Sequence, residues 1–296
     1  SATYIKRSMF IYCSQLIYID VPIVTSIENS AFEGCSLFSN LTFPKVSSIS
    51  SSAFTGNNNI VKLNFSTLKT IGDSTFYSCQ GLKSIYFEEC TSISASAFAN
   101  CYSLESIYLP RLASLGVSAF QSTGLIKIEL NSLTEIRGDG YDSGYQFNGC
   151  SKLTHVTMKS ATFIRRKMFI NCGNLYYLEA PSAVSIEAES FAQCSSLTFV
   201  YLDSCNTMKT NSFTSCNNIK TLSLGSLSVW FGSIPYPNLL VNVSFPLATS
   251  IESGQFKDYQ ELVSCKLPKA SIIKSSAFQN CIKLTELEIP NIVQFD

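Results

Sequence analysis

Apolar residues recur along the chain with a period of 22 residues. The clearest copy spans residues 76–97 and reads FYSCQGLKSIYFEECTSISASA. In this copy Ile85 and Phe87 flank a single outward position, which is the alternation of a short strand with one buried face. The pattern therefore predicts a strand around residues 85–87, with Leu82, Ile85 and Phe87 facing the core.

The first phenylalanine of this copy, Phe76, marks a position that recurs along the chain, mostly every 22 residues. We call this repeat position the phenylalanine slot. Ile234 fits the slot inside one longer step and marks a degenerate copy over residues 234–255, which gives thirteen copies. No single copy can bury its apolar face alone, so neighbouring copies must stack into a solenoid. The phenylalanines in the slot are Phe10, Phe32, Phe54, Phe76, Phe98, Phe120, Phe147, Phe169, Phe191, Phe213, Phe256 and Phe278.

Residues 97–110 contain the motif AF-x-x-C-x-x-L-x-x-I-x-L-P. This motif resembles the BspA-like leucine-rich repeats, and the resemblance covers essentially the whole chain. Together with the period, it implies an α/β repeat solenoid of about 13 repeats of 22 residues. We expect a right-handed superhelix with a parallel β-sheet on the concave face and irregular or 3₁₀-like turns on the convex face. The phenylalanines should stack as a spine on the convex side.

Composition and charge narrow the class of protein. Apolar residues make up 46% of the 296 residues, charged residues 14%, and 21 Lys and Arg balance 21 Asp and Glu. We expect one elongated domain over residues 1–296, without net charge to attract nucleic acid and without a segment that inserts into a membrane. Both ends fall inside repeats, so we expect a fragment of a longer array. We also expect a monomer.

The family resemblance carries the functional expectations. It implies a surface or secreted adhesion protein of bacteria or parasitic protists, which binds a host or matrix protein or a glycan through its concave face. The alternative is a structural stalk or spacer that presents another domain. An open sheet offers no sheltered pocket for convergent catalytic groups, so we expect no enzyme activity and no cofactor.

Outward strand positions are the candidate binding residues. Two groups of aromatic side chains fall there on adjacent copies, together with the only histidine. Exposed tyrosine is enriched in interface cores, although aromatic residues also pair across strands simply to stabilise a sheet. The candidates are Tyr86 and Tyr108 in the first group, Tyr177, Phe199 and Tyr201 in the second, and His155.

Nine of the twelve cysteines occupy one slot, three residues after the phenylalanine. Small buried thiols are the favoured interpretation, because free cysteine is among the most buried residue types. Disulfides between neighbouring copies are an alternative that the spacing allows. A zinc site is a weaker one, because the chain has no C-x-x-C motif and one histidine. We expect no metal site.

Residues 137–146 form an insertion that lengthens one copy to 27 residues. Its glycine-rich polar sequence predicts an extruded loop. The loop begins with Arg137, Gly138 and Asp139, the tripeptide that integrins recognise. A simple turn insertion is the favoured interpretation, and integrin binding and Ca²⁺ binding are the alternatives.

Overall fold

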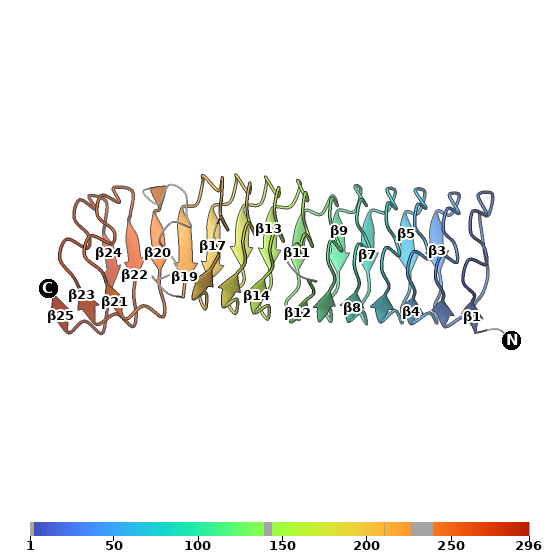
Figure 1. The fold of residues 1–296 in the computed structure, drawn as a ribbon, viewed down its shortest axis with the longest axis horizontal. Coiled ribbons are helices and arrows are strands. Elements are labelled where there is room, and N and C mark those ends of the chain that lie inside the picture. The colour runs from blue at the N-terminus through green and yellow to red at the C-terminus, as the bar shows by residue number, and fades with distance from the viewer. Residues whose placement is uncertain (1–2, 139–143, 210, 226–238, 296) are drawn as a thin grey trace.

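The chain forms an elongated stack of parallel β coils in the computed structural model (Figure 1). The structure describes residues 3–138, 144–209, 211–225 and 239–295. It has about twelve turns, and the two termini lie at opposite ends of its long axis (Figure 1). Strands of successive coils pack side by side along the stack, as expected for a repeat architecture.

The longer strands line up as a ladder along what we call the strand face, their outward side, in three sheets of two, two and eight strands. Apolar residues point inward and polar or aromatic residues outward, because side chains alternate along a strand. Every recorded pair in the ladder is parallel. Its strands are β3 (Asn40–Thr42), β5 (Lys62–Asn64), β7 (Ser84–Tyr86), β9 (Ser106–Tyr108), β11 (Lys127–Glu129), β13 (His155–Thr157), β15 (Tyr177–Glu179), β17 (Phe199–Leu202), β19 (Thr221–Leu224), β20 (Asn242–Ser244), β22 (Ser264–Lys266) and β24 (Glu286–Glu288).

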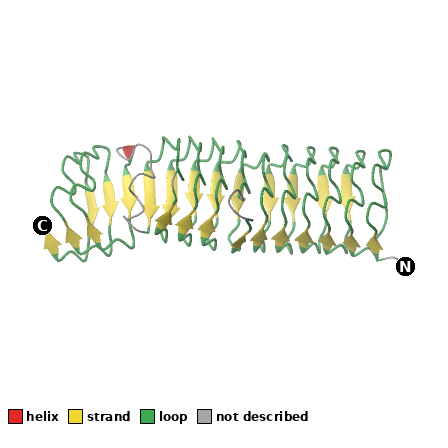
Figure 2. Ribbon diagram, in the orientation of Figure 1, coloured by secondary structure: helices red, strands yellow, loops and turns green. Residues whose placement is uncertain are grey.

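A second ladder of two-residue strands closes the opposite edge of each coil (Figure 2). Most of these strands place one apolar residue in the core. They are β1 (Tyr4–Ile5), β2 (Ser26–Ile27), β4 (Ser48–Ile49), β6 (Thr70–Ile71), β8 (Ser92–Ile93), β10 (Ser114–Leu115), β12 (Glu135–Ile136), β14 (Phe163–Ile164), β16 (Ser185–Ile186), β18 (Thr207–Met208), β21 (Ser250–Ile251), β23 (Ile272–Ile273) and β25 (Gln294–Phe295).

The turn that carries the phenylalanine forms a third set of bonds between coils. Ser96 and Asn100, on either side of Phe98, have φ values of 54° and 63°. In this turn three N–H groups point in one direction. They donate to the next coil over 2.8, 2.8 and 2.9 Å, from Ser96, Phe98 and Asn100 respectively. The same pattern recurs around most of the other phenylalanines in the slot.

The expected phenylalanine spine is confirmed. The rings of Phe76 and Phe98 stack with centroids 5.2 Å apart, and those of Phe98 and Phe120 with centroids 5.3 Å apart. Phe98 itself is fully buried, and Leu82, Ile85 and Phe87 face the core as predicted. The apolar residues of successive coils form one continuous hydrophobic core.

The α/β class and the 3₁₀-like turns are not confirmed. The described residues contain β-strands and turns, with a single 3₁₀ residue at Leu239 and no α-helix. A left-handed residue costs about 1–2 kcal/mol in a helix, and two of them around each phenylalanine prevent a helical turn. The count of thirteen copies is not confirmed either, because Ile234 lies outside the described residues. The coarser prediction of a parallel repeat solenoid is correct.

The insertion interrupts one of the ladders and leaves the other two intact. β11 still pairs with β13, and the rings of Phe120 and Phe147 still stack at 5.6 Å. By contrast, β12 ends one sheet of short strands and β14 begins another. The phenylalanine and strand-face sides therefore pass the insertion in register.

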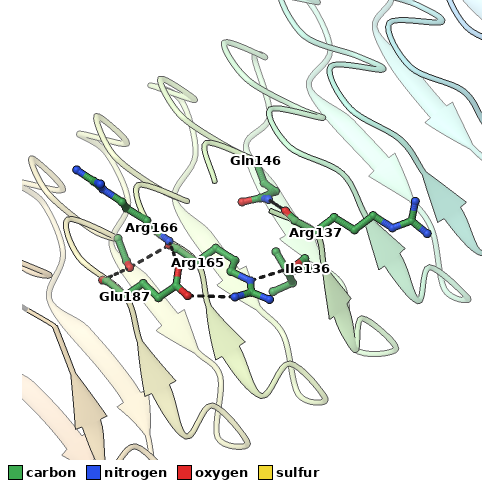
Figure 3. Close-up of polar contacts among 7 residues, drawn as sticks. Ile136, Arg137, Gln146, Arg165, Arg166 and Glu187 are labelled. Atoms are coloured by element: carbon green, nitrogen blue, oxygen red, sulfur yellow. Dashed lines mark hydrogen bonds and ion pairs between the residues drawn. The ribbon is translucent and has the colours of Figure 1, made fainter. Parts of the chain in front are cut away.

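A side chain bridges the interrupted ladder. In regular coils, the N–H that follows a short strand donates to the preceding short strand, as Gly116 does to Ile93 over 2.8 Å. At the interruption the carbonyl of Ile136 instead accepts from Nε of Arg165 at 3.0 Å. Glu187 on the next coil holds the same guanidinium at 3.0 Å (Figure 3). The arginine side chain thus provides a hydrogen-bond donor for a backbone carbonyl that would otherwise have no partner from the next short strand.

Candidate binding surface

Tyr86 and Tyr108 form an exposed stacked pair on the strand face. They are opposite each other in the parallel register of β7 and β9. Their ring centroids are 4.5 Å apart with the planes nearly parallel, and their exposed fractions are 60% and 46%. The two candidates of the first group are therefore together and accessible.

The second group is larger and more closely packed. Tyr177 and Phe199 are opposite each other in the register of β15 and β17, and Tyr201 is opposite Glu179. The rings of Tyr177 and Tyr201 lie 5.6 Å apart at an interplanar angle of 47°. All four side chains are half-buried. They form one patch, which we call the central aromatic patch (Tyr177, Glu179, Phe199 and Tyr201).

His155 lies at the edge of this patch. Its ring stacks on that of Tyr177 at 5.8 Å, and its Nδ1 is 2.9 Å from Oγ1 of Thr154. Burial lowers the pKa of His155, and the positive charge of Lys127 lowers it further. The imidazole is therefore neutral at neutral pH and adds no positive charge to the patch.

Two hollows adjoin the aromatic groups. The first has a volume of about 570 Å³ and lies beside Tyr108, where Lys127 and Glu129 also line it. The second has a volume of about 430 Å³ and lies beside Tyr201, where hydroxyl and amide groups of the next strands line it. Both hollows are open to solvent along the strand face. Neither carries the convergent catalytic groups of an enclosed active site.

Two residues near the central aromatic patch were missed by sequence reasoning. Tyr176 is 43% exposed, and its ring packs edge-on against Phe199 at 5.1 Å. Asp203 follows β17 and accepts a hydrogen bond of 2.5 Å from Oγ of Ser223. Both lie just outside the outward strand positions that the alternation identifies. Their aromatic and acidic types at the strand ends are the only signal that could have found them.

The insertion over residues 137–146 lies partly within the described residues. Arg137 forms an exposed ion pair with Glu135 at 3.1 Å, and its carbonyl accepts from the side chain of Gln146 at 2.8 Å (Figure 3). Gly138 is exposed, whereas Asp139 lies outside the described residues. The integrin and Ca²⁺ interpretations of this loop therefore remain untested.

The loop rejoins the stack at Gly144. The carbonyl of Gly144 accepts the N–H of Ser118 at 3.1 Å, where the regular bonding between coils resumes. A Cβ at this position would collide with the carbonyl of Arg166. Only glycine fits this close approach of two backbones.

Cysteine side chains three residues after the phenylalanines form hydrogen bonds with the backbone of the neighbouring coil. Sγ of Cys101 lies 3.1 Å from the carbonyl oxygen of Phe76, and Sγ of Cys172 lies 3.1 Å from that of Phe147. Where asparagine replaces cysteine, Asn57 donates to Phe32 at 2.9 Å. All twelve cysteines lie in the described part of the chain as free thiols, ten of them buried. The interpretation as buried thiols is therefore correct for ten cysteines, whereas Cys13 is exposed and Cys281 is half-buried.

Possible metal ligands do not gather in the described part of the chain. Groups of three or more His, Cys, Asp or Glu side chains that could hold a metal ion are absent there. No helix among the described residues is long and apolar enough to cross a membrane. The strand face therefore remains the candidate site.

Family comparison assigns the repeats. A family model described as "BspA type Leucine rich repeat region (6 copies)" matches residues 3–127, 114–232 and 236–295. The chain belongs to the BspA-type leucine-rich repeat family. The resemblance expected from the motif at residues 97–110 is thereby confirmed. None of the curated proteins matches this BspA-type chain.

Solved structures of leucine-rich repeat proteins are similar to the BspA-type chain. A leucine-rich repeat protein from Bacteroides ovatus is similar over 99% of this chain and 75% of its own, with 25% identity and a TM-score of 0.63. A leucine rich cell surface protein from Faecalibacterium prausnitzii is similar over 90% of this chain and 83% of its own, with 20% identity and a TM-score of 0.44. The first of these similarities supports the repeat solenoid as a known architecture.

Proposed function

We propose that this chain is a non-enzymatic binding module of a cell-surface or secreted protein, which engages a host or matrix protein or a glycan through its strand face. The observation that carries the proposal is the central aromatic patch. Half-buried tyrosine and phenylalanine side chains gather there beside an open hollow of about 430 Å³. Rigid aromatic side chains supply large contact area at low entropic cost. The surface location rests on the family to which the chain belongs.

The test is a binding screen with the intact chain against extracellular-matrix proteins and glycans. Wild type is compared with the triple variant Tyr177→Ala, Phe199→Ala, Tyr201→Ala, after circular dichroism has established an unchanged fold. We expect the triple variant to lose at least about tenfold in affinity, as for aromatic residues at the centre of an interface.

Two control variants locate the binding surface. Tyr102 is 52% exposed in the turn before β9, away from the outward strand positions, so Tyr102→Ala should bind like wild type. The pair Tyr86→Ala, Tyr108→Ala removes the other exposed aromatic group on the strand face. If this pair loses binding and the triple variant does not, the central aromatic patch is the wrong location.

A structural spacer is the second candidate function. The stack extends along one axis with an uninterrupted core past the insertion (Figure 1), which would suit a stalk that holds another domain away from a surface. Under this alternative, the intact chain binds nothing in the screen. Binding lost by the triple variant would exclude the spacer as the only role.

A further inference from the structure

The central aromatic patch combines two tyrosine rings with one carboxylate. Tyr177 and Tyr201 meet at 47° across two adjacent strands, with their centroids 5.6 Å apart. Glu179 follows Tyr177 on β15 and is opposite Tyr201 in the register. The hydroxyl of Tyr177 donates to Oε2 of Glu179 at 3.3 Å. The carboxylate is therefore held beside both rings.

The charges around this arrangement are one-sided. The sequences of β13, β15, β17, β19 and β20 contain no Lys or Arg, and Glu179 is their only carboxylate. His155 is neutral for the reasons given above. At the end of β17, Asp203 adds a second carboxylate two residues beyond Tyr201. Among the neighbouring cations, Lys127 on β11 is opposite His155, Lys220 precedes β19, and Lys266 on β22 is paired with Glu288 at 3.6 Å.

The hollow beside Tyr201 presents uncharged hydrogen-bonding side chains in the part that lies nearest to the central aromatic patch. Its nearer part is lined by Thr221, Ser223, Asn242 and Ser244. Hydroxyl and amide side chains can donate to carbonyl groups and accept from N–H groups. Such a lining suits the backbone of an extended peptide that runs across the parallel strands.

We infer that the central aromatic patch binds an arginine side chain of an extended peptide, with the guanidinium against Tyr177 and Tyr201 and paired with Glu179. The inference rests on the proposed binding function and names the partner class for that site. The peptide backbone lies in the hollow lined by Ser223 and Asn242. The partner is thus a protein segment with an accessible arginine.

Chemistry favours arginine over other groups. A guanidinium is planar, stacks on aromatic faces and presents paired N–H donors to a carboxylate. Attraction between a cation and an aromatic ring contributes about 0.5–2 kcal/mol. A neutral sugar would stack on the rings and donate hydroxyl hydrogen bonds to Glu179, but it carries no positive charge to neutralise the carboxylate. Charge complementarity therefore distinguishes the two ligand classes.

The experiment uses two capped peptides, Gly-Ser-Arg-Ser-Gly and its analogue with citrulline in place of arginine. Citrulline keeps the size and the planar end group but removes the charge. Binding to the intact chain, labelled with fluorotyrosine, is followed by ¹⁹F NMR, and the Tyr177 and Tyr201 signals are assigned by tyrosine-to-phenylalanine variants. We expect the arginine peptide to shift both signals and to bind about tenfold more tightly than the citrulline peptide.

A matched pair of carboxylate variants completes the test. Glu179→Gln should reduce the affinity for the arginine peptide about tenfold and leave the affinity for the citrulline peptide unchanged. Glu288→Gln is the control, because Glu288 is also an outward strand carboxylate, on β24, with Lys266 and not a tyrosine opposite it. Equal effects of the two variants would overturn the inference, as would equal binding of the two peptides.

Failure of the inference can be distinguished from failure of the proposed function. If neither peptide binds, but a matrix protein or glycan binds in a manner lost in the triple variant, the strand face is the binding surface and the arginine inference is wrong. If the arginine peptide binds and the triple variant abolishes that binding, the inference is supported. If the triple variant binds every ligand like wild type, the patch takes no part in binding.

Discussion

The phenylalanine side of the coil and the strand face are built on opposite principles. On the phenylalanine side, the same residue types return in each coil and bond in the same way, as Phe76, Phe98 and Cys101 do. On the strand face, the outward positions differ from coil to coil, from Ser84 to Tyr177. Residue types must recur at positions that pack against the neighbouring coils, whereas they can vary at positions that face solvent. The comparison separates the residues that fold the chain from those available for recognition.

The insertion sharpens this comparison. The phenylalanine stack and the strand face both continue past residues 137–146, whereas the short-strand ladder does not. Arg165 compensates at that edge with a single side chain. The chain therefore accommodates irregularity at the edge opposite the strand face.

Alkaline pH should destabilise the fold through its buried thiols. Burial raises the pKa of Cys90 and of Cys101 to about 12, from an ordinary value of 9.0. In the unfolded chain these thiols ionise first, so the stabilising contribution of each is complete below pH 9 and is lost as the pH rises toward 12. The equilibrium constant for unfolding should increase about tenfold per pH unit for each such thiol.

Urea titrations at pH 8, 9.5 and 11 measure this dependence. The variant Cys90→Ala, Cys101→Ala is the control, because it lacks two of the titrating thiols but keeps every tyrosine. Its stability should fall less steeply with pH than that of wild type. Identical slopes would show that the buried thiols do not govern alkaline unfolding.

Removal of one ring from the spine should have the next largest effect. Phe98→Ala deletes a fully buried side chain stacked on Phe76 and Phe120. The rigid stack cannot close the cavity, so we expect a loss of about 3–5 kcal/mol in the free energy of unfolding by urea. Tyr102→Ala, at an exposed position, should change stability by no more than about 0.5 kcal/mol. A loss below about 1 kcal/mol for Phe98→Ala would mean that the stack can relax.

Loss of the bridging arginine should have the smallest effect of the three. Arg165→Ala removes the donor to the carbonyl of Ile136 and the ion pair with Glu187. We expect a loss of about 1–3 kcal/mol, because a backbone acceptor loses its partner. Hydrogen exchange should increase in β12 and β14 and stay unchanged in β11 and β13.

Arg111→Ala serves as the control for this variant. Its ion pair with Glu89 is exposed, and exposed pairs contribute about 0–1 kcal/mol. If the two variants lose the same stability, Arg165 is an ordinary surface residue and does not repair the ladder.

Much of the fold could be predicted from the sequence, because a 22-residue period of apolar positions indicates a stack of similar coils. The inward positions of Leu82, Ile85 and Phe87 follow from alternation, and the stacking of the phenylalanines follows from the 22-residue step. The turn around each phenylalanine could not be predicted. Ser96 has a positive φ, yet serine carries no sequence signal for that region as glycine or asparagine would. The bonds between coils, and not local propensity, hold it there.

The face of the molecule that carries the candidate site could be predicted from the sequence, but the arrangement of its side chains could not. The period places Tyr177 on the same face as Tyr201, whereas the angle between their rings depends on packing between coils. The contact of Arg165 with Ile136 was also beyond sequence reasoning, because it joins residues 29 positions apart across an interrupted copy. Residues 139–143 and 226–238 lie outside the described part of the chain, so the Asp139 and Ile234 expectations stay predictions.

The bonds of the phenylalanine turns give the stack an electrical direction. In each regular turn, three N–H groups point toward the C-terminal end of the array and none point back, whereas N–H groups that follow the short strands, such as that of Gly116, point to the preceding coil and offset part of this alignment. Aligned peptide dipoles add along a common axis, as they do in an α-helix. Here the positive end lies toward the C-terminus, which is the reverse of a helix. Every added coil lengthens this dipole, so an array of such coils would orient in an electric field according to its length.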